Sequence, residues 1–196
     1  MKNRSLKLTN WLFALILVPF LSSCSYNKMV SLDEGVKSQW AQVQNAYQRR
    51  ADLIPNLVNT VKGYANFEKE TLTAVVEARS KATSVNVDAS KLDANTFKKF
   101  QEAQDGLGQS LSRLMVVVEK YPDLKANQNF LELQAQLEGT ENRISVERQK
   151  FNTATQEYNT AIRKFPANLT AKMFGFTDKP YFEATKGADK APTVQF

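Results

Sequence analysis

The side chains of this sequence that could carry acid–base chemistry are its carboxylates, because the chain contains no histidine. That absence excludes serine–histidine and cysteine–histidine catalytic pairs and the usual zinc and haem ligand sets. Glu77 with Glu119, or Glu138 with Glu141, could act as a general acid and a general base. All four lie in helical sequence without a glycine-rich phosphate loop or any other sign of a cleft, so a solvated helix surface is the favoured interpretation. We expect no catalytic residues, no metal and no cofactor.

The single cysteine, Cys24, points to a different chemistry. Three basic residues are followed by eleven mostly apolar ones, residues 11–21, and then by Leu21-Ser22-Ser23-Cys24. This order resembles the lipobox of bacterial lipoproteins, in which the cysteine is lipidated, for example with palmitate, and becomes the new N-terminus. We therefore predict a lipoprotein-type signal peptide over residues 1–23 and a lipid-linked stub over residues 24–31. The alternative is an uncleaved membrane anchor with an incidental cysteine, although eleven apolar residues are short for a membrane span.

Export and charge restrict the partners. The whole chain has a net charge of +6, but without the N-terminal Lys2, Arg4 and Lys7 it keeps 23 of its 26 basic residues against 20 acidic ones, a net charge of +3. This modest excess does not indicate nucleic-acid binding. We expect a protein of the bacterial cell envelope, lipid-anchored to a membrane with its folded part outside the cytoplasm.

Apolar residues at seven-residue spacing predict two long helices. The first covers residues 32–65 and is expected to be kinked near Pro55, with a seam formed by Trp40, Tyr47, Ile54 and Val61. The alternative, a new helix capped by Asp52 with Pro55 in its first turn, is disfavoured because the seam keeps its register across the proline. The second long helix covers residues 123–165, with a seam formed by Phe130, Leu137, Ile144, Phe151, Tyr158 and Phe165.

Two shorter helices, residues 67–83 and 96–120, are predicted between them, joined by a polar loop. With few glycines and prolines, this pattern predicts an all-α protein: an antiparallel, up-down-up-down four-helix bundle with long first and fourth helices and a short C-terminal helix near residues 166–176. The bundle domain would span residues 32–182, and the polar residues 183–196 would be a disordered tail.

Two sets of polar residues interrupt these helices. Arg50 and Glu147 stand in otherwise apolar lines, and the antiparallel register sets them opposite each other, so they are a candidate ion pair. The alternative is that both charged groups extend into water at the edge of the bundle. A polar stripe at spacings of three and four is a candidate partner surface, although an ordinary wet helix face is the favoured explanation. Its members are Arg49, Asp52, Asn56 and Asn59.

Several segments resemble the LemA family, and together they cover nearly all of the chain after Cys24. They are residues 26–30, 48–65, 77–79, 136–144, 158–166 and 174–176. The resemblance implies a membrane-attached helical bundle in the envelope, without an assigned biochemical activity. Members of this family commonly begin with a membrane-spanning helix, and here a lipobox takes its place.

Long heptad helices, a lipid anchor and no catalytic set favour a non-catalytic scaffold or adaptor for protein partners. The alternative is an envelope hydrolase that uses carboxylates in a cleft, and a deep pocket with convergent carboxylates would favour it.

Overall fold

The computed structural model describes the backbone of residues 2–63 and 68–183, and the side chains of residues 25–63 and 68–183. Within these residues the protein is all helical and has no β-strand, as the sequence predicted. The predicted disordered tail lies outside the described residues, apart from Glu183. Among the residues whose side chains are described, no helix carries an apolar stretch long enough to cross a bilayer.

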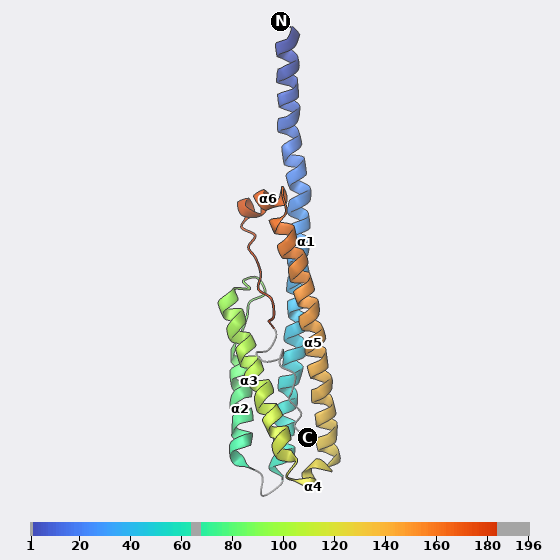
Figure 1. The fold of residues 1–196 in the computed structure, drawn as a ribbon, viewed down its shortest axis with the longest axis vertical. Coiled ribbons are helices and arrows are strands. Elements are labelled where there is room, and N and C mark those ends of the chain that lie inside the picture. Colours follow the sequence, from blue (N-terminus) through green and yellow to red (C-terminus); the bar gives the residue numbers. More distant parts are fainter. Residues whose placement is uncertain (1, 64–67, 184–196) are drawn as a thin grey trace, which may run out of the picture.

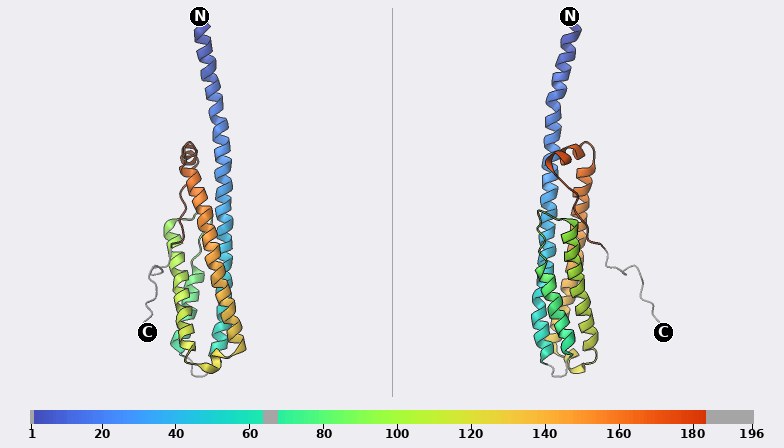
Figure 2. Two further views of the ribbon diagram at one scale, coloured as in Figure 1. Left: turned by 45° about the vertical axis from the view of Figure 1, so that its right-hand side comes forward. Right: turned by 90° about the vertical axis from the view of Figure 1, so that its left-hand side faces the viewer.

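Four long helices lie lengthwise beside one another (Figure 1). α5 runs back along α1, and α3 runs back along α2, so both pairs are antiparallel (Figures 1 and 2). A short α4 joins α3 to α5 at one end, and a short α6 follows α5 at the other. The bounds are α1, Lys2–Lys62; α2, Lys69–Ser84; α3, Ala94–Val118; α4, Pro122–Lys125; α5, Gln128–Arg163; and α6, Ala167–Phe174.

The first helix is longer than predicted at its N-terminal end. α1 begins at Lys2 rather than at Leu32, so the stub expected over residues 24–31 is part of the helix. Its buried line of residues starts at Met29 and continues through Val36 and Val43, at the same seven-residue spacing as the rest of the seam. α1 passes through Pro55 without interruption, as its unbroken register predicted.

The fourth predicted helix is divided in two. Residues 123–165 were expected to form one helix, but α4 ends at Lys125 and α5 begins at Gln128. Pro122 stands in the first turn of α4, where its missing N–H is not needed. The side chain of Asn127 then caps α5 by accepting a hydrogen bond from the backbone N–H of Phe130 at 3.1 Å.

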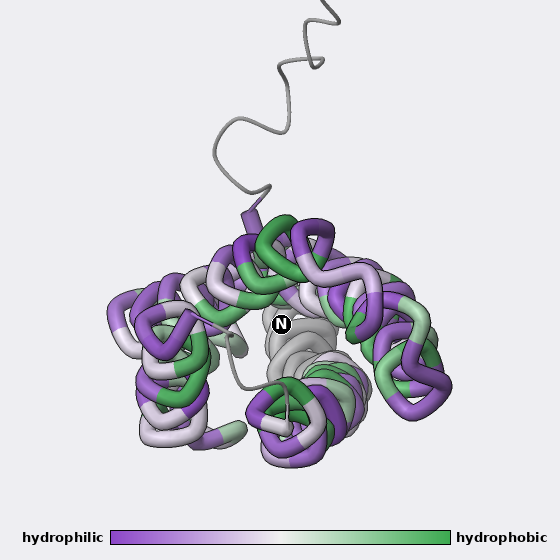
Figure 3. The backbone as a smooth tube through the Cα atoms, turned by 90° about the horizontal axis from the view of Figure 1, so that it is seen from below, coloured by the Kyte–Doolittle hydropathy of each residue, from purple (hydrophilic) through white to green (hydrophobic). Residues whose placement is uncertain are grey.

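The buried residues form an aromatic cluster and an aliphatic cluster, one after the other along the bundle. The aromatic cluster centres on Trp40, whose ring lies 5.1 Å from that of Phe100 and 5.5 Å from those of Phe97 and Phe151. The aliphatic cluster begins about two turns beyond Tyr47 along α1, at Ile54. Many apolar positions lie toward the interior of the helix assembly, and polar ones predominate on its outer side (Figure 3).

The polar connection between α2 and α3 also contributes to the core. Val87 and Leu92 are buried, and the backbone carbonyl of Val87 accepts hydrogen bonds from Trp40 Nε1 at 3.2 Å and from Gln44 Nε2 at 3.3 Å. These contacts tie the connection to the middle of α1.

Candidate functional site

A buried polar layer separates the aromatic cluster from the aliphatic cluster. Its centre is Arg50 of α1, which is only 3% exposed. Its Nη1 donates to Glu141 Oε2 of α5 at 2.7 Å, and its Nη2 donates to the backbone oxygen and to Oε1 of Gln104 of α3, at 3.1 and 2.9 Å. Gln104 is itself fixed, because its Nε2 donates to the carbonyl of Ala82 at 3.1 Å. One guanidinium group therefore links α1, α3 and α5 and, through Gln104, the end of α2.

The predicted ion pair between Arg50 and Glu147 is wrong in its acidic partner. Glu147 is buried, but it interacts with cations of its own helix, Lys150 at 3.2 Å and Arg143 at 3.9 Å. The two charged groups lie on different sides of the line along which α1 packs against α5. Arg50 and Glu141 line a groove that α3 also borders, whereas Arg143, one turn before Glu147, lines a separate depression with Arg49.

The groove lies between α3 and α5, with Arg50 in its floor. Its volume is about 650 Å³. The walls mix both charges with apolar side chains: Arg113 and Arg148 against Asp105, Glu138 and Glu141, with Leu111, Met115 and Leu137 between them. The Nε of Arg50 is buried and has no acceptor among the described residues. The groove thus offers apolar and charged surface side by side, over a buried guanidinium group.

Burial shapes the chemistry of Tyr47, one turn before Arg50. Removal from water raises the pKa of Tyr47 to about 12, although the charges of Arg148 and Arg50 act in the opposite direction. The phenol therefore stays protonated at neutral pH and does not act as a base. The guanidinium of Arg50 lies 5.1 Å from the centre of this ring, so the ring also stabilises the buried cation.

The same gap between α3 and α5, beside the aromatic cluster, is filled by the chain itself. After α6, residues 176–183 run as an extended segment, which we call the strap (Figure 1). Phe182 of the strap is buried, with its ring 4.6 Å from that of Phe97 and 5.5 Å from that of Phe151. The strap therefore completes the core where no helix covers it.

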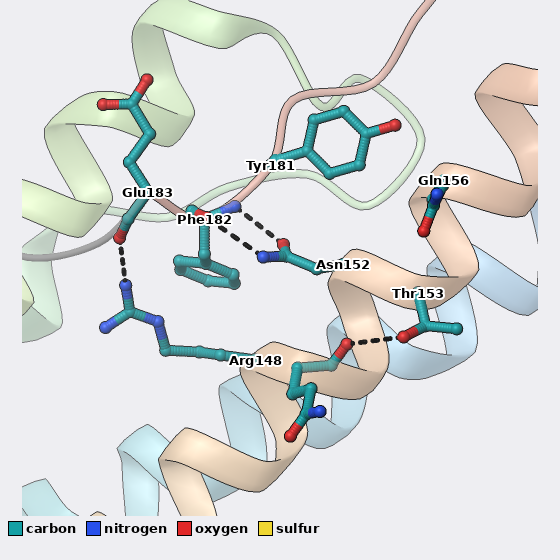
Figure 4. Close-up of a pocket in the computed structure, with 8 residues that line it drawn as sticks. Arg148, Asn152, Thr153, Gln156, Tyr181, Phe182 and Glu183 are labelled. Atoms are coloured by element: carbon teal, nitrogen blue, oxygen red, sulfur yellow. Dashed lines mark hydrogen bonds between the residues drawn. The ribbon is translucent and has the colours of Figure 1, made fainter.

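Side-chain amides hold the backbone of the strap. Asn152 donates from Nδ2 to the carbonyl of Phe182 at 3.0 Å and accepts from its N–H at 2.9 Å (Figure 4). Asn159, two turns further along α5, makes the same pair of bonds with Lys179, both at 2.9 Å. Arg148 donates to the carbonyl of Glu183 at 2.9 Å and lies over the Phe182 ring at 4.6 Å. The paired hydrogen bonds of Asn152 and Asn159 bind main-chain groups, as a neighbouring β-strand would. They therefore do not depend on which side chains the bound segment carries.

The end of the strap stands at the mouth of the groove. Gln101 of α3 donates to the carbonyl of Glu183 at 3.0 Å, and Gln104, one turn further along α3, lines the groove. Arg148 borders both the groove and the depression beside the strap. The groove therefore continues the path of the strap.

Comparison with known proteins places these residues in a family. A model of the LemA family matches residues 39–196, which include the groove and the strap. The chain belongs to the LemA family. It is 27% identical to magnetosome protein MamQ of Magnetospirillum gryphiswaldense over 194 residues, which cover 89% of this chain and 71% of that protein. It is 24% identical to protein LemA of Metamycoplasma hominis over 160 residues, which cover 82% of this chain and 69% of that protein.

A third relative gives a similar result. The chain is 27% identical to magnetosome protein MamQ 2 of Paramagnetospirillum magneticum over 181 residues, which cover 84% of this chain and 66% of that protein. All three similarities extend over most of the chain. The assignment to the LemA family, predicted from the sequence motifs, is confirmed.

The other predicted site residues of this LemA-family chain have the following places. Arg49, Asp52, Asn56 and Asn59 are all exposed on the outer side of α1, where Asp52 accepts a hydrogen bond from Gln48 at 2.7 Å. Cys24 belongs to α1, but its side chain lies outside the described residues. The use of the stripe by a partner and the lipidation of Cys24 both stay predictions.

Three of the four carboxylates considered for catalysis are engaged in structural contacts. In the groove Glu141 binds Arg50, and Glu138 accepts a hydrogen bond from Gln134 at 3.0 Å. Glu119 pairs with Lys125 at 2.5 Å, and Glu77 is exposed on α2. A hydrolase would need one carboxylate free to donate a proton and another free to attack or activate water.

Sequence reasoning missed the residues that shape this part of the LemA fold. Asn152 and Asn159 are seven residues apart, which is a heptad signal in polar residues. Gln101 and Gln104 show no pattern that distinguishes them from solvated glutamines. Their role arises only where the strap and Arg50 meet α3.

Proposed function

We propose that this LemA-family protein is a membrane-tethered, non-catalytic scaffold of the bacterial cell envelope that binds an extended segment of a partner protein in the groove between α3 and α5. The proposed body is an up-down-up-down four-helix bundle outside the cytoplasm, and the proposed tether is a lipid on Cys24. Similarity to proteins whose names describe magnetosome proteins, not enzymes, agrees with a structural role.

One observation carries the proposal. The gap between α3 and α5 already accepts an extended chain along the part occupied by the strap, and the adjoining part is an open groove lined by Arg113 and Arg148. A partner segment entering there would follow the path of the strap. Carbonyl or carboxylate oxygens could reach Arg50, Arg113 and Arg148, while Leu111 and Leu137 could receive an apolar side chain.

Site-specific photo-crosslinking in cells tests this function. A photoreactive amino acid at Ser112, an exposed position lining the groove, should capture a defined partner through an identifiable peptide. Arg113→Glu, at the lip of the groove, should abolish that product. Lys99→Glu, a charge reversal at an exposed position of α3 outside the groove, is the matched control and should leave it unchanged.

Other results would contradict the groove as the binding site. A crosslink from position 112 to residues 184–196 of the same chain would mean that the protein fills its own groove. A crosslink that is unchanged by Arg113→Glu but lost with Asp52→Lys would show that the partner binds the polar stripe on α1 instead of the groove. A probe at Asn56 would then capture the same partner.

A further inference from the structure

α6 packs against α1 directly beside the predicted anchor. The ring of Phe174 lies 4.7 Å from that of Tyr26, and the ring of Phe176 lies 5.9 Å from it. Tyr26 is two residues after Cys24, which is about 3 Å along a helix axis. Beyond this contact α1 continues past all the other helices toward the N-terminus (Figures 1 and 2).

The outward side of α6 is apolar. Leu169 and Met173, four residues apart on the same side of α6, are 61% and 69% exposed, and we call these two residues the α6 face. Ala171, on the opposite side of the helix, and Thr170 are buried, and the ring of Phe174 lies on Tyr26 of α1. A soluble surface helix normally has the reverse arrangement. Large apolar groups gathered on one exposed face indicate a surface that something covers.

The charges beside this face are basic. Lys172 is exposed on α6, and Lys164 is exposed where α5 ends. The nearby Asp178 is bound by Arg163 through two hydrogen bonds of 2.9 and 2.7 Å. An apolar face with lysines around it matches a bilayer surface, where acyl chains lie beneath anionic headgroups.

Both possible anchors place the bilayer at this end of the protein. A lipid on Cys24 would hold the membrane within one helical turn of Tyr26. If residues 11–21 were instead embedded, their last residue, Leu21, would lie about 8 Å from Tyr26 along the axis of α1. We propose that the α6 face lies in the headgroup region of the membrane as a second contact. The inference rests on the membrane attachment in the proposed function, and it adds where the bundle touches the bilayer.

The depth of one side chain in the bilayer tests this proposal. The full-length protein, carrying an environment-sensitive fluorescent amino acid at position 173, is reconstituted into vesicles of phosphatidylethanolamine and phosphatidylglycerol. The matched control has the same probe at Val146, which is also exposed but lies in the middle of α5. A quencher attached to the lipid should reduce emission at least about twofold more at position 173 than at position 146, as expected for a residue at the headgroup boundary.

A second variant connects the signal to the α6 face. Leu169→Glu places a charge on this face without removing a buried group, and it should reduce the lipid quenching at position 173. Leu131→Glu, a similar change at an exposed leucine at the far end of α5, should leave the quenching unchanged.

The outcomes separate this inference from the proposed function. Vesicles that carry the protein but do not quench position 173 would overturn the α6 contact alone. Protein that does not float with vesicles would overturn the membrane tether and the α6 contact together. Shielding of position 173 from aqueous iodide without quenching from the lipid would show that protein, such as a second copy, covers the face, and this would also overturn the proposal.

Discussion

Arg79 of α2 donates its Nε–H to the backbone carbonyl of Ala51 of α1 at 2.8 Å. Ala51 stands four residues before Pro55, which has no N–H to give to that carbonyl. The arginine therefore supplies the hydrogen bond that the proline removes. This contact explains how α1 passes through a proline beside a fully buried Ile54 without leaving a buried carbonyl unpaired.

The first prediction concerns this substitute donor. Arg79→Met should destabilise the protein by about 1–3 kcal/mol, the cost of leaving a buried acceptor unpaired. In a Pro55→Ala background the helix supplies its own N–H, so the same change should cost less than about 1 kcal/mol. Chemical denaturation of the four proteins measures the difference, and Lys81→Met on the exposed side of α2 is the control. Equal costs in the two backgrounds would show that Arg79 does not replace the lost bond.

The second prediction concerns the partner of Arg50. A double-mutant cycle of Arg50→Met with Glu141→Gln should give a coupling of about 1 kcal/mol, because Glu141 is 61% exposed and its pair with Arg50 is partly screened. The same cycle with Glu147→Gln should give a coupling near zero, because Glu147 is paired within α5. Coupling to Glu147 instead would restore the pair predicted from sequence.

The third prediction concerns the amide that holds the strap. Asn152→Asp replaces the group that donates to the carbonyl of Phe182 by a second acceptor, so it should destabilise the strap by about 1–3 kcal/mol. The backbone amides of Lys179 and Phe182 should then exchange with solvent faster in hydrogen-exchange measurements. Gln156→Glu, an exposed position one turn away, is the matched control. Unchanged exchange in the Asn152 variant would exclude this amide as the residue that secures the strap.

The fourth prediction is a loss of strap stability in acid. Burial acts to raise the pKa of Asp33, but hydrogen bonds from Lys179 and Lys37, at 2.6 and 2.8 Å, outweigh it and leave the pKa below its usual value. The bidentate contact with Arg163 likewise lowers the pKa of Asp178. A carboxyl group with a lowered pKa in the folded state contributes stability above its unfolded pKa, near pH 4, and loses it as the pH falls through the folded pKa.

The protection factors of the strap amides, corrected for the intrinsic exchange rate at each pH, should therefore fall below about pH 4, because Asp33 binds Lys179 of the strap and Asp178 of the strap binds Arg163. Asp33→Asn removes one of the two groups, so its unfolding free energy should be lower at neutral pH and should fall less steeply in acid. Parallel curves for this variant and the wild type would mean that the Asp33–Lys179 contact is not the acid-sensitive element.

The fifth prediction concerns the anchor. Wild-type protein grown with a fatty-acid analogue should incorporate the label, and Cys24→Ala should not, because the cysteine is the proposed acceptor. Two or three acyl chains contribute about 0.8 kcal/mol for each buried methylene, so they should dominate attachment over the α6 face. Equal labelling of the two proteins would show that Cys24 is not the lipid attachment site, and residues 11–21 would then be the candidate membrane anchor.

Local periodicity predicted the four long helices of this protein, but not the N-terminal extension of α1 or the break between α4 and α5. The seven-residue spacing of Trp40, Tyr47 and Ile54 carries α1 through Pro55, because a buried seam depends only on which residues recur on one side of a helix. The same rule, applied to Met29 and Val36, would have extended the helix toward its N-terminus. The motifs that resemble the LemA family are likewise contained in the sequence.

Only the tertiary structure decided which groups meet. A heptad register shows that Arg50 lies next to α5. The contact with Gln104 of α3 decides toward which side the guanidinium points, and Glu141 lies on that side, whereas Glu147 does not. The amide pairs of Asn152 and Asn159 depend on a strap without periodicity that returns from beyond α5. The outward direction of Met173 follows from which side of α6 packs on the bundle. These relationships join residues distant in the chain, so no local pattern specifies them.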